Sequence, residues 1–159
     1  MKSLKTTHGK ISFSWKKTFW LYLMLVSIFF IDFQKVAALD ICLVLILTLL
    51  SVGIGHSVGL HRGIIHKSYT SSRLFWNTSL LCFVITGLGS PLSWLKQHYF
   101  RDYWQNRKDC PKYFRYQHSL FQDYLWNLHL TFTPKDLGRY NIPTKDLKDK
   151  KIAHYNTYW

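Results

Sequence analysis

The stretch "GHSVGLHRGIIHKSY" at residues 55–69 places three histidines five residues apart, directly after a long apolar run. Neutral imidazole is the commonest side-chain ligand of iron, copper and zinc in proteins. A spacing of five residues turns the second side chain by roughly 140° around a regular helix axis. His61 and His66 can therefore share an ion only if the helix ends or overwinds between them, and Gly63 lies at a suitable place. The alternative is that these histidines merely cap a helix end and meet lipid headgroups.

Two apolar segments precede the histidines and together predict a transmembrane helical hairpin over residues 18–60. The first is "TFWLYLMLVSIFFIDF", and the second is "VAALDICLVLILTLLSVGIG", which has about the length of a bilayer-spanning helix. We place the two helices at about 18–34 and 36–58. The turn between them contains four polar residues, Asp32, Gln34, Lys35 and Asp40.

The formal net charge of +13 is concentrated outside the apolar segments. The bilayer core rejects charge, whereas the cytoplasmic headgroup surface attracts lysine and arginine. The polar, basic tail at 1–17 carries five lysines and the region after residue 60 is also basic, while the turn has only Lys35. This distribution predicts an integral membrane protein with its N-terminus and its histidines in the cytoplasm. No nucleic-acid-binding motif is present, so we expect no nucleic-acid partner.

The segment "RLFWNTSLLCFVITGLGSPLSW" at 73–94 contains too many polar, glycine and proline residues for a full span. It predicts an interfacial amphipathic helix at about 74–92, inside a cytoplasmic histidine-box region over 61–132. Residues 133–159 are polar and typical of a loop-like tail. The expected fold class is therefore all-α integral membrane, with a transmembrane hairpin, an interfacial helix and a cytoplasmic region of helices and loops.

The stretch around the second and third histidines resembles the first histidine box of the integral-membrane acyl desaturases. In that family a G-x3-G-x-H-R-x3-H-x-S/R-Y pattern follows a transmembrane hairpin and ligates one iron of a diiron centre. The resemblance extends from about residue 18 to about residue 130. The matching positions are Gly55, Gly59, His61, Arg62, His66, Ser68 and Tyr69.

The second histidine box of that family, usually H-R-x-H-H, corresponds to "HYFRDYWQNRKDCP" at 98–111. His98 keeps the first position, but Arg101 and Asp102 stand where the family has paired histidines. Asp102 offers carboxylate oxygens, whereas Arg101 cannot bind iron; an ion pair on the surface is the alternative for both. The resemblance implies that the iron ligands are His61, His66 and His98, with His56 and Asp102 as weaker candidates. It also implies that Arg62 contacts a group behind the ligands or a lipid headgroup.

The family's third box, of the form H-x2-H-H, has no counterpart in this sequence. His118, His129 and His154 fit no such pattern, and the first two are spaced as on one face of a packed helix. A diiron centre that activates dioxygen takes around eight ligands, so the candidates supply about half a site. We therefore expect an incomplete diiron centre, a C-terminal half that carries the third box, and no activity from this chain alone.

The resemblance implies a fatty acid desaturase-like membrane oxidoreductase, which uses iron and dioxygen to introduce a double bond into a fatty acyl chain. The implied partners are membrane lipid, the fatty acyl substrate, an electron-donor redox protein and the C-terminal half. The alternatives are a non-catalytic, degenerate membrane protein, one half of a split enzyme, and a related diiron hydroxylase. Cys42, Cys82 and Cys110 form neither a zinc-binding pair nor a disulfide framework.

Overall fold

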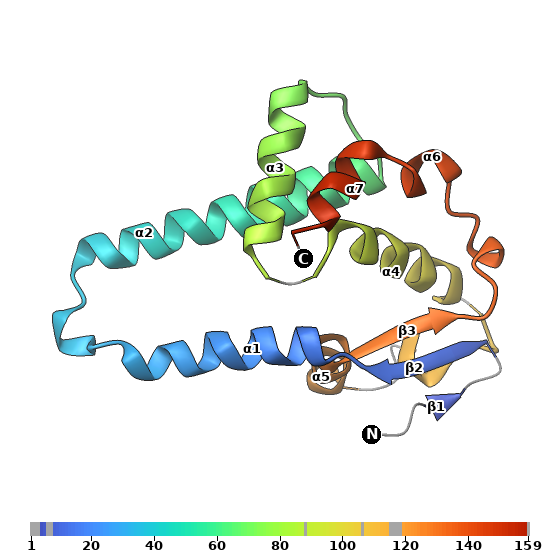
Figure 1. The fold of residues 1–159 in the computed structure, drawn as a ribbon, viewed down its shortest axis with the longest axis horizontal. Helices are drawn as coiled ribbons and strands as arrows, with labels where there is room; N and C mark the ends of the chain where they lie inside the picture. The colour runs from blue at the N-terminus through green and yellow to red at the C-terminus, as the bar shows by residue number, and fades with distance from the viewer. Residues whose placement is uncertain (1–3, 6–7, 88, 106, 115–118, 159) are drawn as a thin grey trace.

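The computed structural model describes residues 4–5, 8–87, 89–105, 107–114 and 119–158. These residues form a body at one end, from which two long helices extend (Figure 1). The elements in chain order are β1 (Leu4–Lys5), β2 (Gly9–Phe13), α1 (Trp15–Ser27), η1 (Ile28–Phe30), η2 (Phe33–Lys35), α2 (Ala38–Thr48), η3 (Leu49–Ile65), α3 (Arg73–Ile85), α4 (Pro91–Trp104), η4 (Lys112–Phe114), α5 (Leu120–His129), β3 (Leu130–Pro134), η5 (Gly138–Tyr140), α6 (Thr144–Leu147) and α7 (Lys150–Asn156).

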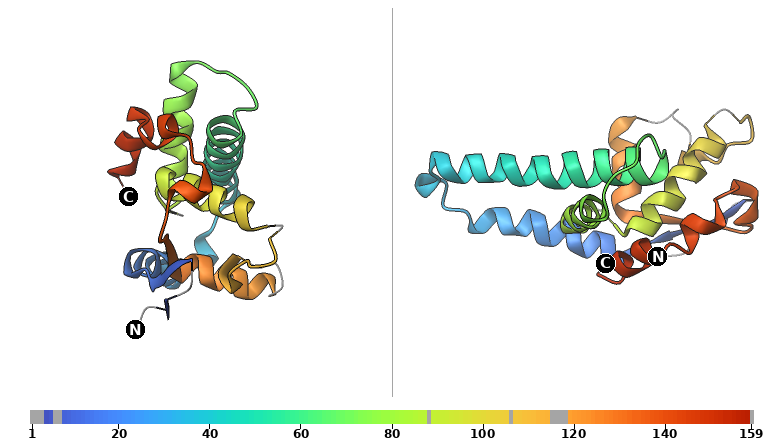
Figure 2. Two further views of the ribbon diagram at one scale, coloured as in Figure 1. Left: turned by 90° about the vertical axis from the view of Figure 1, so that its right-hand side faces the viewer. Right: turned by 90° about the horizontal axis from the view of Figure 1, so that it is seen from above.

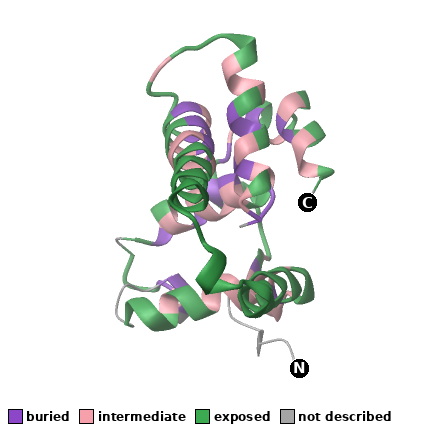
Figure 3. Ribbon diagram, turned by 90° about the vertical axis from the view of Figure 1, so that its left-hand side faces the viewer, coloured by how far each residue is buried: buried purple, intermediate pink, exposed green. Residues whose placement is uncertain are grey.

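The two extending helices are α1 and the continuous run of α2 and η3, which is antiparallel to α1. The large apolar side chains of α1, α2 and the first residues of η3 are exposed, as the green ribbon in Figure 3 shows, whereas Leu60 and Ile65 near the end of η3 are buried in the body. The α2–η3 run, Ala38–Ile65, is the one helix of the described chain that is long and apolar enough to cross a membrane. α1 has 13 residues and is followed by the short 3₁₀ helix η1, so the predicted first span at 18–34 is not a single helix.

The polar turn predicted between the apolar segments is confirmed, and it lies at the tip that is farthest from the body (Figure 1). Asp32 Oδ1 accepts a hydrogen bond from the backbone N–H of Gln34 at 3.2 Å, where η2 begins. Asp40 Oδ2 accepts one from the N–H of Ala37 at 2.9 Å, where α2 begins. Such caps satisfy backbone groups that have no partner within the helix.

The prediction of a mainly helical protein is confirmed, but the described chain also contains a three-stranded antiparallel sheet, in the order β1-β2-β3, which an all-α class does not include. Strand β2 pairs with β3 from Gly9 opposite Pro134 to Phe13 opposite Leu130. The predicted N-terminal tail therefore belongs to the body of the protein. Because β2 leads directly into α1, the chain leaves the body through α1 and returns to it through η3. A five-residue strand whose partner is more than a hundred residues away leaves no local periodicity by which it could be predicted.

The predicted interfacial helix at 74–92 is two helices, α3 and α4, joined by a turn. Gly87 in this turn has a φ of +66°, a left-handed conformation that glycine adopts without strain and that ends α3. The Ser90 hydroxyl then accepts a hydrogen bond from the N–H of Ser93 at 3.1 Å, and Pro91 occupies the first position of α4. α3 packs across η3 with one face and exposes Leu74, Leu81 and Ile85 on the other.

The segment at 133–159, predicted as a loop-like tail, contains α6 and α7, and α7 packs against α3 and α4. Ile152 of α7 is buried, and Asp149 caps this helix by accepting hydrogen bonds from two backbone N–H groups. Lys67 Nζ, just after η3, lies 2.8 and 3.0 Å from the two carboxylate oxygens of the buried Asp146. This ion pair fixes the C-terminal segment to the loop that follows the histidines. The core of the body includes Leu60, Leu80, Phe83, Leu95, Phe100, Trp104, Tyr113, Phe114, Phe132 and Tyr140.

Candidate metal centre

The five-residue spacing of the histidines is explained by η3, which is a π-helix of 17 residues. A π-helix is wider than an α-helix because each N–H bonds to the carbonyl five residues earlier. Such helices are rare in proteins, and those that occur often lie at functional sites. The N–H of His66 donates to the carbonyl of His61 at 3.0 Å. Residues five apart therefore lie one above the other. The expectation that the helix ends or overwinds at Gly63 is wrong, because the helix is underwound and continues to Ile65.

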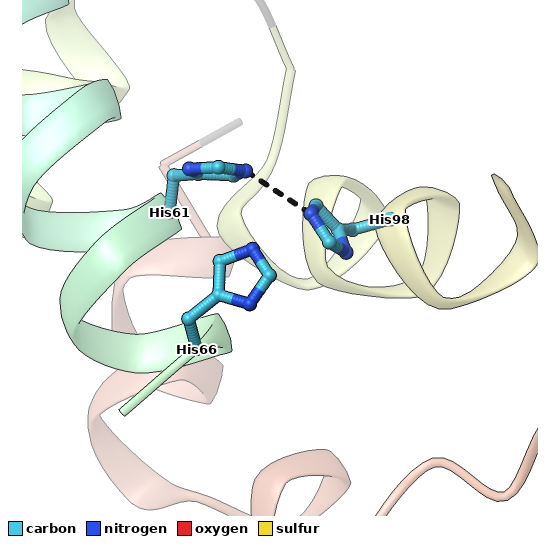
Figure 4. A group of neighbouring side chains, drawn as sticks. All are labelled: His61, His66 and His98. Atoms are coloured by element: carbon cyan, nitrogen blue, oxygen red, sulfur yellow. Dashed lines mark hydrogen bonds between the residues drawn. The ribbon is translucent and has the colours of Figure 1, made fainter. Parts of the chain in front are cut away.

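The structure brings together His61 from η3, His66, which caps the C-terminal end of η3, and His98 from α4 (Figure 4). One ligand nitrogen from each ring lies within 4.8 Å of those from the other two. The Nε2 atoms of His61 and His98 are 3.1 Å apart. The three ring centroids are 4.6–4.9 Å from one another. Three imidazoles from two helices thus converge on one point, and His66 keeps this point open to the outside because its side chain is exposed.

Three glycines of η3 allow this helix to approach α3 closely. A Cβ atom at Gly55 would lie 2.5 Å from the backbone nitrogen of Phe83 and 2.7 Å from the carbonyl carbon of Cys82. The next two glycines, Gly59 and Gly63, lie against the side chains of Ser79 and Trp76. The glycines thus hold η3 against α3. Their spacing of four residues is visible in the sequence and is the signal for this close helix contact.

Asp102, which was a candidate ligand, lies behind His98 instead. Its Oδ2 is 3.0 Å from His98 Nδ1, one helical turn further along α4, which leaves His98 Nε2 facing His61. Burial lowers the pKa of the His98 imidazole, and the Asp102 carboxylate opposes this shift. The net lowering of the pKa favours the neutral imidazole, which is the form that binds metals. A carboxylate that contacts the far nitrogen of a ligating histidine fixes the orientation of the ring. The i, i+4 spacing of the two residues is the signal that would have revealed this role.

The other predicted site residues lie outside the cluster. The ring of His56 is 6.3 Å from that of His61 and packs at 4.6 Å against Trp94. Arg62 is exposed and follows His61 directly in η3, so its predicted contact with a group behind the ligands or with a lipid headgroup stays a prediction. Arg101 does not pair with Asp102, since its guanidinium donates to both carboxylate oxygens of Asp123 in α5, at 2.9 and 3.1 Å.

Of the remaining histidines, His129 and His154 serve structural contacts in the described chain. His129 Nδ1 is 3.0 Å from the hydroxyl of Thr18 in α1. His154 is exposed on α7 and lies close to Tyr158. His118 lies outside the described residues, so the predicted helix face that it shares with His129 stays a prediction.

The geometry fits a metal ion. Two imidazole nitrogens that are each about 2.1 Å from one ion lie roughly 3.0–3.4 Å apart, and the His61–His98 separation of 3.1 Å falls in this range. The ligand nitrogen of His66 lies within 4.8 Å of those of His61 and His98, so it is the third candidate ligand of the same ion. No family model, curated protein or solved structure matches this chain. The function is therefore argued from the site and from the exposed apolar surface.

Replacing Asp102 with alanine is expected to weaken metal binding by about 10- to 100-fold, because His98 loses the carboxylate that orients it. Asp102→Asn keeps an oxygen near His98 Nδ1 and should lose less. Competition titration with a chromogenic chelator measures both affinities. Asp136→Asn, an exposed change on the loop before η5, is the control. If Asp102→Ala binds metal as tightly as this control, the carboxylate has no role in the site.

Proposed function

We propose that this chain binds a transition metal ion, most simply iron, through His61, His66 and His98 at the surface of a membrane. The convergence of three imidazole nitrogens within 4.8 Å is the observation that carries the proposal. Imidazole is a good ligand for iron, zinc and copper, so the donor set itself admits several metals. The resemblance of the first histidine box to the acyl desaturases favours iron among them.

The membrane placement is supported by the apolar surface of α1, α2 and η3. Exposed large apolar side chains cover both arms of the pair, and charged residues are confined to its tip and base. Contiguous apolar patches of this size are rarely left in water by soluble proteins. We infer that both arms enter the bilayer from the same side, since β2 and the histidines belong to one body. The basic residues of the body then face the cytoplasmic headgroups.

The chemistry that we propose is oxidation of a fatty acyl chain, as in the desaturases. A bound iron ion would supply dioxygen activation, with electrons from a redox protein. The residues of this chain would hold the ion: His61 and His66 from the membrane-emerging helix, and His98 oriented by Asp102. Three ligands are about half of what a diiron centre takes, and no second cluster lies in the described chain. Desaturation by this chain therefore requires further ligands from another polypeptide segment. The same centre would serve hydroxylation of the acyl chain equally well.

The proposed iron site is tested with nitric oxide, which binds ferrous iron where dioxygen would bind. Protein in lipid nanodiscs is loaded anaerobically with ferrous iron, and a high-spin iron–nitrosyl signal is recorded by electron paramagnetic resonance. We expect about one iron per chain and a nitrosyl signal that is lost in His98→Ala and kept in His154→Ala. Iron that binds but takes no nitric oxide would contradict oxygen chemistry. Iron that is not retained at all would favour the non-catalytic membrane protein.

The membrane topology gives a separate prediction. Reporters fused at residue 35 and at residue 95 are expected on opposite sides of the membrane, with an N-terminal reporter on the same side as residue 95. The physical reason is that residue 35 lies at the tip of the apolar pair, whereas the other two positions belong to the body. Protease protection in oriented membrane vesicles measures all three. If residues 35 and 95 are accessible from the same side, the arms do not cross the bilayer.

A further inference from the structure

Helix α5 presents an apolar face that no described part of the chain covers. Leu120, Phe121 and Tyr124 are 82%, 73% and 67% exposed, and Leu125 is 41% exposed. At 100° per residue these four side chains occupy one side of the helix. The opposite side contacts the body, where Asp123 and Trp126 are partly buried. An isolated exposed leucine is ordinary, but a continuous apolar face on one amphipathic helix marks an interaction surface.

The direction of α5 relative to the apolar arms indicates what covers this face. In Figure 1 α5 is seen almost along its axis, at the base of α1, whereas in both views of Figure 2 it is seen from the side. Its axis therefore runs across the direction of the arms. If the arms cross the bilayer, α5 lies parallel to the membrane plane, at the level where α1 enters.

The end of α5 is fixed to the start of α1 by several hydrogen bonds, one of which runs from Lys17 Nζ to the carbonyl of Asn127 at 3.2 Å. The N–H of Ser14 donates to the carbonyl of His129 at 2.8 Å, and Lys17 Nζ donates to the carbonyl of Leu130 at 3.1 Å. The Thr18 hydroxyl is 3.0 Å from His129 Nδ1. These bonds fix the position of α5 relative to the start of α1. Both segments therefore lie at the same depth in whatever surrounds the protein.

We propose that α5 is an interfacial membrane helix, with Leu120, Phe121, Tyr124 and Leu125 buried among the headgroups and upper acyl chains of a phospholipid bilayer. The inference rests on the proposed membrane insertion of the arms. Helix α5 contacts the base of α1, where the exposed apolar surface of α1 begins at Trp15 beside Lys16. Tryptophan and lysine at the end of an apolar helix are typical of the membrane–water interface, where anionic lipids also attract the lysines.

This contact also sets the depth of the metal centre. Arg101 in α4 donates two hydrogen bonds to Asp123 of α5, and it lies one turn from His98. α4 is thus held between α5 at the bilayer surface and η3 as it emerges from the bilayer. The three histidines are kept at the height of the headgroups, where an acyl ester is within reach of the site.

The test measures the depth of single positions in vesicles of phosphatidylcholine and phosphatidylglycerol. The three native cysteines are replaced, and a bimane fluorophore is attached to Phe121→Cys, Gln122→Cys or Leu43→Cys. Gln122 is the matched control, because it is exposed on α5 at the edge of the polar side, and Leu43 reports on the α2 arm. Quenching is compared for nitroxide on the headgroup, nitroxide deep in the acyl chain, and iodide in water. Photoreactive lipid that labels peptides of the unaltered chain gives a second measurement that needs no substitution.

We expect nitroxide on the headgroup to quench the fluorophore at position 121 at least twofold more than at position 122. Iodide should quench position 122 more than position 121. Nitroxide deep in the acyl chain should quench position 43. Lipid photolabelling should fall on the peptide that contains 120–125. Equal iodide quenching at 121 and 122, with position 43 still deep, overturns the α5 proposal and leaves the membrane arms intact. Iodide quenching at position 43 overturns the membrane insertion itself. Shielding of 121 from lipid and iodide in a dimeric protein means that a second copy covers the face, which also overturns the proposal.

Discussion

Replacing His61 with alanine is expected to lower the metal affinity of the chain by more than about 100-fold, and His66→Ala and His98→Ala should do the same. Each change removes one of only three converging nitrogens, a greater loss than the 10- to 100-fold typical of a supporting residue. Metal content after gel filtration, measured by mass spectrometry, should fall from about one ion per chain to near zero.

Two histidines of the same chain serve as controls for this result. His56 precedes His61 by the same five residues that separate His61 from His66, but its ring packs against Trp94 and lies outside the cluster. His154 is exposed on α7. His56→Ala and His154→Ala are expected to retain the ion. Equal losses in all five variants would mean that the ion binds nonspecifically to surface imidazoles.

The second large effect is expected from Gly55→Ala, which should destabilise the body by about 1–3 kcal/mol. The added Cβ would lie 2.5 Å from the backbone nitrogen of Phe83, and a backbone atom cannot move aside as a flexible side chain can. η3 would have to separate from α3, which would also displace His61 and His66 from His98. The thermal midpoint of the protein in detergent and its retained metal should therefore fall together.

Gly53→Ala is the matched control for this prediction, since both glycines lie in η3, two residues apart. The nearest atom to a Cβ at Gly53 is Cδ1 of Leu49 at 3.1 Å, the end of a side chain that can rotate away. Alanine also has a higher helix propensity than glycine. We expect this variant to keep the thermal midpoint and the metal of the unaltered protein. If Gly55→Ala behaves in the same way, the close approach of η3 and α3 does not shape the site.

The identity of the three candidate ligands could be predicted from the sequence, but the helix geometry that brings His61 and His66 together could not. The resemblance of the first box predicts that His61 and His66 bind the same iron. In a regular α-helix, however, their side chains would point about 140° apart around the axis. In the structure this segment is a π-helix, whose wider turns bring the two histidines to one side, and it packs against α3. His98 was selected because of the family pattern, yet the role of Asp102 could have been read from the i, i+4 spacing alone.

The errors in the fold have two different origins. The sheet cannot be predicted from local patterns, because β2 and β3 are short and far apart in the chain and only the tertiary structure pairs them. The split of the predicted helix at 74–92 was predictable, since the sequence contains Gly87, Gly89, Ser90 and Pro91, which together mark the end of one helix and the start of the next. Helices α6 and α7 are short and polar, and they fold because a few residues such as Ile152 are buried against α3 and α4.

The most direct test of a three-histidine metal centre is X-ray absorption spectroscopy of the unaltered protein, loaded with one equivalent of zinc or ferrous iron in nanodiscs. The multiple scattering that is characteristic of imidazole rings reports how many histidines bind the ion. The proposed centre predicts about three imidazoles per ion, with zinc–nitrogen distances of about 2.0–2.1 Å. Coordination by oxygen alone, or by a single imidazole, would show that His61, His66 and His98 lie close together without binding a common metal.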